Sequence, residues 1–143
     1  MKVIFEIPGK PTGKGRPRFR RNGSVYTPEA TESYENLVKL YYKINTHGAK
    51  LTGEIRASIV AVFPIPKSNS KKVRAQKLDG TIRPTVKPDC DNIAKIVLDA
   101  LNHIAYDDDS QVVSLELQKK YGEEPKTIVI LEELKHEGES LHV

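Results

Sequence analysis

The 143-residue sequence has one cysteine, no tryptophan and no long apolar run. A single cysteine, Cys90, allows no internal disulfide, which predicts a reducing, cytoplasmic environment. The longest apolar stretch, around 57–63, is much shorter than the roughly 20 residues that span a bilayer, so we expect no membrane partner. The N-terminal MKVIFEIPGK carries charges within its apolar pattern, which is typical of a strand and not of a signal peptide.

Motifs for several kinds of site are also missing. The four histidines, His47, His103, His136 and His142, are scattered, and with one cysteine they form no zinc-binding set. No Gly-x-x-x-x-Gly-Lys-Ser/Thr phosphate loop and no serine or cysteine nucleophile pattern is present, so we expect no small-molecule cofactor. An EF-hand that began at Asp89 would need glycine and glutamate where alanines stand.

The order of predicted elements indicates a small α/β domain. Residue periodicity predicts strands at about 2–7, 54–63, 112–119 and 127–134, and helices from Pro28 to Gly48, from Ser70 to Gly80 and from Asn92 to His103. We expect Thr27 to cap the first helix, and the second strand to be central because it is apolar on both faces near its end. This order predicts a single domain over residues 1–143, in which helices pack against a mixed β-sheet.

The net charge of +4 is distributed unevenly. One basic segment without any acid contains Lys14, Arg16, Arg18, Arg20 and Arg21, and a second contains Lys71, Lys72 and Arg74. Glycine and proline keep the first segment open, which suits contact with nucleic-acid phosphates, although such charges are equally typical of an ordinary solvated surface. Phe19 lies among these arginines, where it would either stack on bases or anchor the loop in the core.

An acidic motif opens the third predicted helix. Its polar stripe carries Asp91, Lys95 and Asp99, and the opposite face is apolar. One aspartate, most simply Asp91, would cap the helix, and Lys95 would pair with either neighbour. A second aspartate, Asp89, is not needed for capping, and two neighbouring carboxylates repel each other unless they share a cation. Oxygen ligands favour Mg²⁺, with Mn²⁺ as a substitute, and we expect Cys90 to turn into the core.

A third acidic group follows in YDDDSQVV, at residues 106–113. Three aspartates in a turn are often only a solvated loop. Here the next strand leaves the turn soon after the helix ends, and we expect it to run back and bring one aspartate near Asp89 and Asp91. Carboxylates from two elements around Mg²⁺ commonly activate water against a phosphodiester, and Lys95 would then neutralise charge on the scissile phosphate.

Together these segments resemble a known family. PDCDNIAKIVLDALN followed by YDDDSQVV resembles the signature of RusA-family Holliday junction resolvases, in which Asp-x-Asp-Asn-x-x-Lys and Asp-Ala-Leu precede an acidic pair close to Gln-Val. GKPTGKGRPRFRRNGSVYTP is also similar to the basic segment that opens many bacterial and prophage members. The resemblance extends over nearly the whole chain, and its central motif is far more specific than a lone Asp-x-Asp.

The resemblance implies roles for individual residues. Asp89 and Asp91 match the first two metal ligands of the family, and Lys95 matches its catalytic lysine. Asp109 matches the last ligand because it stands two residues before Gln-Val, and Asp108 is a rival because this chain has three aspartates where two are usual. The family further implies a homodimer that depends on Mg²⁺ and makes paired, symmetric nicks in four-way DNA during recombination and repair. Two equivalent cuts on a two-fold junction call for two related sites.

Two alternatives remain open at this point. The chain could be a nucleic-acid-binding protein without catalytic activity, whose aspartates only cap a helix and solubilise a turn. It could also be a metal-dependent nuclease that prefers flaps or single strands, because branch recognition depends on surface shape.

Overall fold

A four-stranded mixed sheet forms the centre of the computed structural model, which describes residues 1–135, so that His136 and His142 lie outside the described residues. The strands are β1 (Lys2–Pro8), β4 (Ile55–Pro64), β5 (Val112–Gly122) and β6 (Lys126–Glu133), in the order β1-β6-β4-β5. β4 runs parallel to β5 and antiparallel to β6, which is antiparallel to β1. The prediction of a mixed sheet with β4 in its interior is confirmed.

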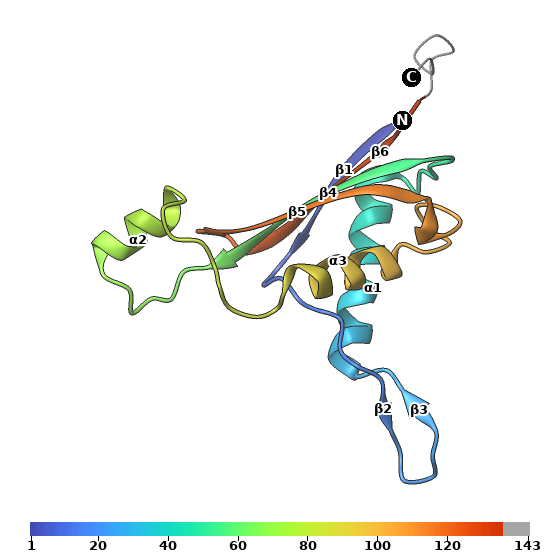
Figure 1. Ribbon diagram of the computed structural model, residues 1–143, viewed down its shortest axis with the longest axis horizontal. Helices are drawn as coiled ribbons and strands as arrows, with labels where there is room; N and C mark the ends of the chain where they lie inside the picture. The colour runs from blue at the N-terminus through green and yellow to red at the C-terminus, as the bar shows by residue number, and fades with distance from the viewer. Residues whose placement is uncertain (136–143) are drawn as a thin grey trace.

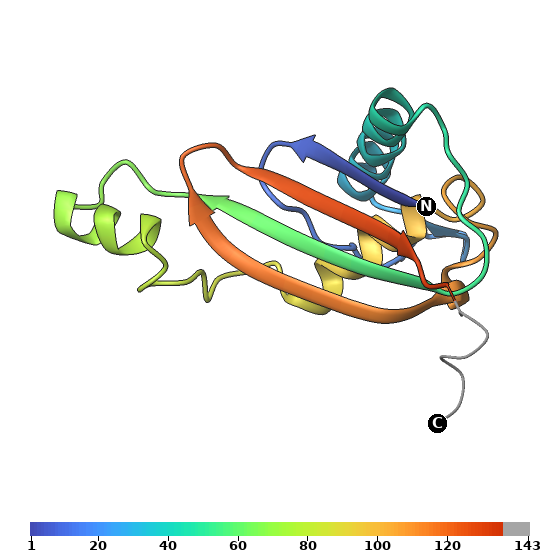
Figure 2. The ribbon, with the colours of Figure 1, turned by 90° about the horizontal axis from the view of Figure 1, so that it is seen from above.

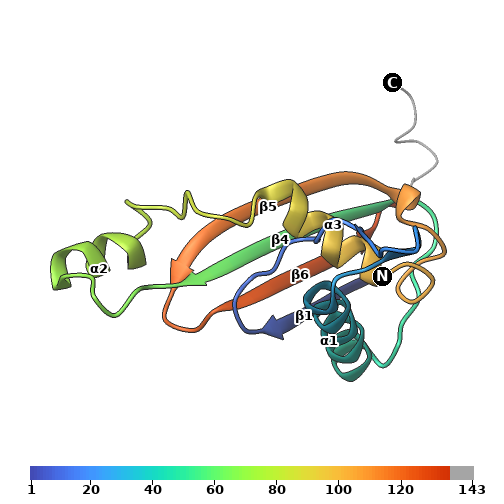
Figure 3. The same ribbon diagram turned by 90° about the horizontal axis from the view of Figure 1, so that it is seen from below.

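Two helices cover one face of this sheet. They are α1 (Glu29–Thr46) and α3 (Cys90–Ala100), and both lie in front of the sheet in Figure 3. Within residues 1–135, no helix covers the opposite face, which Figure 2 presents to the viewer. Between helices and sheet lie buried apolar side chains from every layer, including Phe5, Tyr42, Ile59, Ile96 and Leu131. The apolar face predicted for the third helix is therefore the face that packs on the sheet.

Some helix boundaries differ from the sequence prediction. Ser70 caps α2 (Lys71–Leu78) as expected, because its hydroxyl accepts a hydrogen bond from the amide of Val73 at 3.2 Å. Pro28 occupies the N-cap position of α1 without a capping side chain, so the expectation that Thr27 caps this helix is wrong. α3 begins two residues earlier than predicted and ends three residues earlier. The last difference moves the residues before the acidic turn out of the helix.

A short hairpin was not predicted as regular structure. It consists of β2 (Arg18–Phe19) and β3 (Val25–Tyr26), paired antiparallel, and it projects beyond the start of α1 at the bottom of Figure 1. α2 projects from another part of the molecule, beyond the end of the sheet. Among residues 1–135, no helix combines the length and apolar character needed to cross a membrane.

Candidate functional site

The start of α3 presents two aspartates to solvent. Asp89 holds the N-cap position with extended backbone (φ −70°, ψ 158°), and Asp91 lies in the first turn. Neither carboxylate forms a hydrogen bond or ion pair with any residue in the described part of the chain, so the expectation that Asp91 caps the helix is wrong. The positive end of the helix dipole still favours negative charge here. Both carboxylates are thus available to a ligand from outside the protein.

Lys95 and Cys90 are also exposed on this part of the helix. Lys95 follows Asp91 by one turn, yet no ion pair joins it to Asp91, to Asp99 or to any other residue that the structure describes. Cys90 lies at the surface, which corrects the expectation that it packs into the core. The reason is its place in the first turn of α3, since the residues that pack on the sheet begin with Ile93. The N-terminal half of α3 therefore presents one ammonium and two carboxylates that form no ion pair with a described residue.

A cavity of about 650 Å³ opens at this end of the helix, with Asp89 in its wall. Four basic residues line it: Lys10, Lys14, Arg16 and Lys87. Sequence reasoning did not assign Lys10 or Lys87 to the site. The position of Lys87, two residues before Asp89, was a usable signal, whereas the approach of Lys10 depends on the path of a glycine- and proline-rich loop. We refer to this space as the basic cavity, and its charges suit the phosphates of a nucleic acid.

Close backbone contacts fix the loop that forms one wall of the basic cavity. A Cβ on Gly13 would lie 2.8 Å from Cβ of Pro88 and 3.1 Å from Cβ of Asn92, so only glycine allows this approach to α3. The amide of Lys14 donates to the carbonyl of Asn92 at 3.0 Å. At the next residue, the amide of Gly15 donates to the hydroxyl of Thr31 on α1 at 2.9 Å. The loop is thus attached to the beginnings of both helices.

The side chain of Lys14 strengthens this attachment. Its ammonium lies 2.6 Å from a carboxylate oxygen of Glu35 on α1 and 3.3 Å from one of Asp99 on α3. Burial opposes the charge, but the two carboxylates outweigh it and raise the pKa of Lys14. Lys14 therefore carries a structural ion pair between loop and helices, and its predicted contact with DNA stays a prediction.

The acidic turn, residues 107–109, lies at the other end of α3. The Asp108 carboxylate caps a short 3₁₀ turn (Asp109–Gln111) by accepting from the amide of Ser110 at 3.0 Å, which lowers the pKa of Asp108. Asp107 is exposed and pairs with Lys50 at 2.7 Å, which lowers the pKa of Asp107. These two carboxylates thus have partners within the protein.

Asp109 has a different environment from its two neighbours. Its amide donates to the side chain of Asn102 at 2.8 Å, and its carboxyl group lies beside Asp99. Burial, followed by the negative charges of Asp108 and Asp99, raises the pKa of Asp109. A partly buried carboxylate crowded by like charges is a better candidate for a cation ligand than one that caps a turn.

Asp109 does not meet Asp89 and Asp91 within one chain. Asp91 and Asp99 are separated by about 12 Å of helix axis, since each residue adds about 1.5 Å, and Asp109 lies beside Asp99. Within residues 1–135, no three acidic, histidine or cysteine side chains are placed to hold one metal ion. β5 does run back along α3, as predicted. The acidic turn precedes this strand, however, and so lies at the C-terminal end of α3, away from Asp89 and Asp91 (Figure 1). The expectation that the turn folds next to the pair is therefore wrong for the single chain.

The remaining predicted DNA contacts lie on two projections. Arg16, Arg18, Arg20 and Arg21 are exposed along the loop and hairpin, and none forms an ion pair with a described residue. On α2, Lys71 and Lys72 are exposed, and Arg74 lies 3.4 Å from Glu123. Both projections present positive charge away from the sheet.

Known proteins are similar to this chain over most of its length. The family model described as endodeoxyribonuclease RusA matches residues 8–132. The chain is also 41% identical over 137 residues to a Bacillus subtilis (strain 168) protein that bears the name uncharacterized protein YqaN, with 92% of this chain and 96% of that protein covered.

Proposed function

Because the chain belongs to the RusA family of endodeoxyribonucleases, we propose that it is a Mg²⁺-dependent endonuclease that resolves four-way DNA junctions by paired, symmetric nicks. The proposal rests on the arrangement of side chains at the start of α3. Two carboxylates that have no partner in the described part of the chain lie there beside a cavity lined by four basic residues. This combination provides for a divalent cation and for the DNA phosphates that would share it.

The donor set at this end fits Mg²⁺ in one respect and not in another. Mg²⁺ is commonly held by one or two carboxylates together with substrate phosphates, and Asp89 and Asp91 supply that number. The third ligand implied by the family pattern, Asp109, lies at the opposite end of α3. When bound, Mg²⁺ supplies a Lewis acid and lowers the pKa of a coordinated water. We propose Asp89 and Asp91 as its ligands at the basic cavity, and Asp109 as a further ligand that a single chain does not bring there.

The other residues act on the phosphate. Lys95 lies one turn beyond Asp91 and forms no ion pair with a described residue, so its ammonium is available to offset the charge that develops on a scissile phosphodiester. Lys10, Arg16 and Lys87 line the cavity and would hold the flanking phosphates of the same strand. Binding would therefore weaken as the salt concentration rises, because each neutralised phosphate releases counterions.

We propose further that the active protein is a homodimer. Two equivalent nicks in a four-way junction require two sites related by the symmetry of the DNA. One feature of the chain supports self-association: β5 is a long edge strand, and Leu115 on it is 48% exposed. An exposed edge of this kind is a common surface for pairing with another chain.

Titration with metal separates this proposal from the alternative of a DNA-binding protein without activity. Wild-type protein is incubated with a labelled four-way junction while Mg²⁺ or Mn²⁺ is increased from zero, and binding is measured in parallel at several salt concentrations. We expect cleavage that requires the metal, together with binding that does not. Tight, salt-dependent binding without cleavage at any metal concentration would favour the binding protein and contradict the proposal.

A further inference from the structure

The hairpin β2–β3 exposes apolar side chains in a strongly basic setting. Phe19 is 76% exposed and Val25 is 55% exposed, and the two face each other across the strands as a direct pair. Residues 16–26, which we call the basic arm, carry four arginines and no acidic residue. Phe19 therefore does not anchor the loop in the core, and its exposure needs another explanation.

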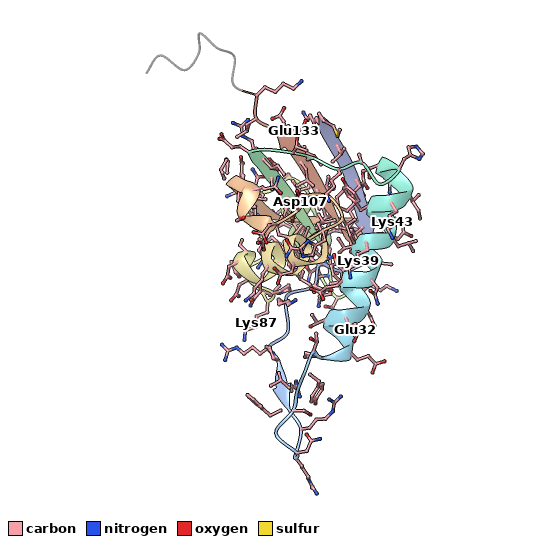
Figure 4. All side chains as sticks on the ribbon, turned by 90° about the vertical axis from the view of Figure 1, so that its right-hand side faces the viewer. Glu32, Lys39, Lys43, Lys87, Asp107 and Glu133 are labelled. Atoms are coloured by element: carbon pink, nitrogen blue, oxygen red, sulfur yellow. The ribbon has the colours of Figure 1, made fainter. Side chains whose placement is uncertain are left out.

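The structure of the arm keeps Phe19 uncovered. Arg18 and Tyr26 form the neighbouring cross-strand pair, and the guanidinium of Arg20 lies 4.6 Å from the centre of the Tyr26 ring. That cation–π contact covers Tyr26, whereas no ring or cation from the described part of the chain covers Phe19. Figure 4 shows the arm extending away from the body of the protein, with its side chains pointing outward. The Tyr26 ring is thus held by a contact within the arm, whereas the Phe19 ring is exposed to solvent.

The arm is also held in a defined shape. The amide of Arg20 donates to the carbonyl of Ser24 at 2.8 Å, and the amide of Gly23 donates to the carbonyl of Arg20 at 2.9 Å, which closes the tip. At its base, Gly13 and Gly15 attach the preceding loop to α3 and α1. Because both tip and base are fixed, inserting the ring costs less conformational entropy than it would in an unstructured loop.

The arm continues directly from the basic cavity. Arg16 lines that cavity and also begins the arm, so a DNA strand held at the cavity would meet the arm next. Four arginines favour the phosphates of DNA, and a flat apolar ring among them favours a base whose face is open. In a linear duplex the faces of the bases are stacked, whereas bases at a branch point can open.

We propose that the basic arm places Phe19, with Val25 beside it, against bases that open at the branch point of the DNA held at the basic cavity. This inference rests on the proposed function, because it takes the same DNA as partner. It assigns to Phe19 the recognition of the branch, while the arginines contact phosphates without regard to shape.

The test measures binding and base stacking without metal, so that cleavage does not interfere. A four-way junction and a linear duplex of the same length carry 2-aminopurine at the central positions. We expect wild-type protein to raise the fluorescence of the junction more than that of the duplex. Phe19→Ala should remove this difference and weaken binding to the junction by roughly 5- to 150-fold, the effect of losing one aromatic–base stack, with little change for the duplex.

Three further variants make the result specific. Phe19→Trp should preserve both signals, because it keeps an aromatic face. Phe19→Leu should keep part of the affinity for the junction but lose the difference in fluorescence between junction and duplex, because leucine cannot stack on a base. Leu40→Ala on α1, where the leucine is also exposed, should behave as wild type. Because Phe19 is largely exposed, none of the Phe19 variants should alter the unfolding midpoint in urea.

Several outcomes would overturn the inference. Equal weakening on junction and duplex would reduce Phe19 to a general contact, and unchanged binding would remove its role altogether. If Phe19→Ala instead changes the mass in solution without DNA, the arm docks on a second copy of the chain. Cleavage with Mg²⁺ is measured on the same junction. If Phe19 stacks on the junction but the wild-type protein never cleaves it, the proposed function is refuted while the inference about the basic arm stands.

Discussion

The two ends of α3 carry carboxylates in opposite situations. At the start of the helix, Asp89 and Asp91 are exposed and have no partner among residues 1–135. At its end, Asp99 pairs with Lys14, and Asp109 lies between a like charge and the side chain of Asn102. Burial raises the pKa of the nearby Tyr106, and the negative charges of Asp109 and Asp99 raise it further, so Tyr106 stays a neutral phenol. Acidic residues of one motif can therefore divide into a set left open for a ligand and a set connected to the fold.

The largest effect should come from the open set. Asp91→Asn should abolish cleavage, because it removes a negative ligand, while junction binding stays equal or becomes tighter as repulsion of the phosphates falls. The measurements are nicking of a labelled junction with Mg²⁺ and binding without it. Asp107→Asn is the matched control, since it removes the same charge from an exposed aspartate that pairs with Lys50. Loss of binding together with cleavage would instead indicate that Asp91 supports the helix.

A second pair of variants tests the other end of α3. Asp109→Asn should also prevent cleavage, whereas Asp108→Asn should cleave close to the wild-type rate, because asparagine can still cap the turn at Ser110. Single-turnover nicking rates with excess protein distinguish the two variants. If Asp108→Asn is the inactive variant instead, Asp108 is the ligand. If both variants cleave at the wild-type rate, the chemistry is confined to the start of the helix.

Removing the ion pairs that join the loop to α1 and to the end of α3 should affect stability. Lys14→Met leaves Glu35 and Asp99 partly buried without their cation, and it should lower the free energy of unfolding by about 1–3 kcal/mol. Urea denaturation gives this value directly. Lys10→Met in the same loop is the control, because the structure gives its side chain no ion pair with a described residue. An unchanged midpoint for Lys14→Met would show that the loop is held by its backbone contacts alone.

The smallest effect belongs to a single cation of the basic cavity. Lys87→Ala should weaken junction binding and reduce the slope of log affinity against log salt by about 1, as expected for one lost phosphate contact. Lys43→Ala, on α1 and labelled together with Lys87 in Figure 4, serves as control on another surface. An unaltered salt dependence would place the DNA outside this cavity.

Local patterns predicted the elements well because each depends on nearby residues. The alternation in β1 and β4, the cap at Ser70 and the apolar face of α3 all follow from periodicity and hydrogen bonding within a few positions. The two-residue strands of the basic arm were missed, since a glycine- and arginine-rich segment has no periodicity of its own. The burial of a residue is harder to predict from a local pattern. Leu115 pairs with the buried Ala57 and lies on the same face of the sheet, yet it is half-exposed because β5 is an edge strand.

For the candidate site, the sequence suggests which residues take part but does not predict how they are arranged. The motif around Asp89 identifies the acidic residues and Lys95, but the place of Asp109 depends on where the acidic turn lies relative to the strand that follows it. Similarly, Lys14 belongs to a basic run, yet its ammonium pairs with carboxylates 21 and 85 positions further along the chain. Contacts over such separations depend on the whole fold, which no local pattern encodes.

The central claim concerns a nuclease that recognises branched DNA, and mapping the nicks tests it most directly. A labelled four-way junction, a linear duplex and a flap of the same sequence are incubated with the wild-type protein, with and without Mg²⁺, and the products are resolved at nucleotide resolution. We predict paired nicks at symmetric positions in the junction, only with Mg²⁺, and no comparable cutting of the other two. Equal cutting of all three substrates, or no cutting of the junction, would contradict the account.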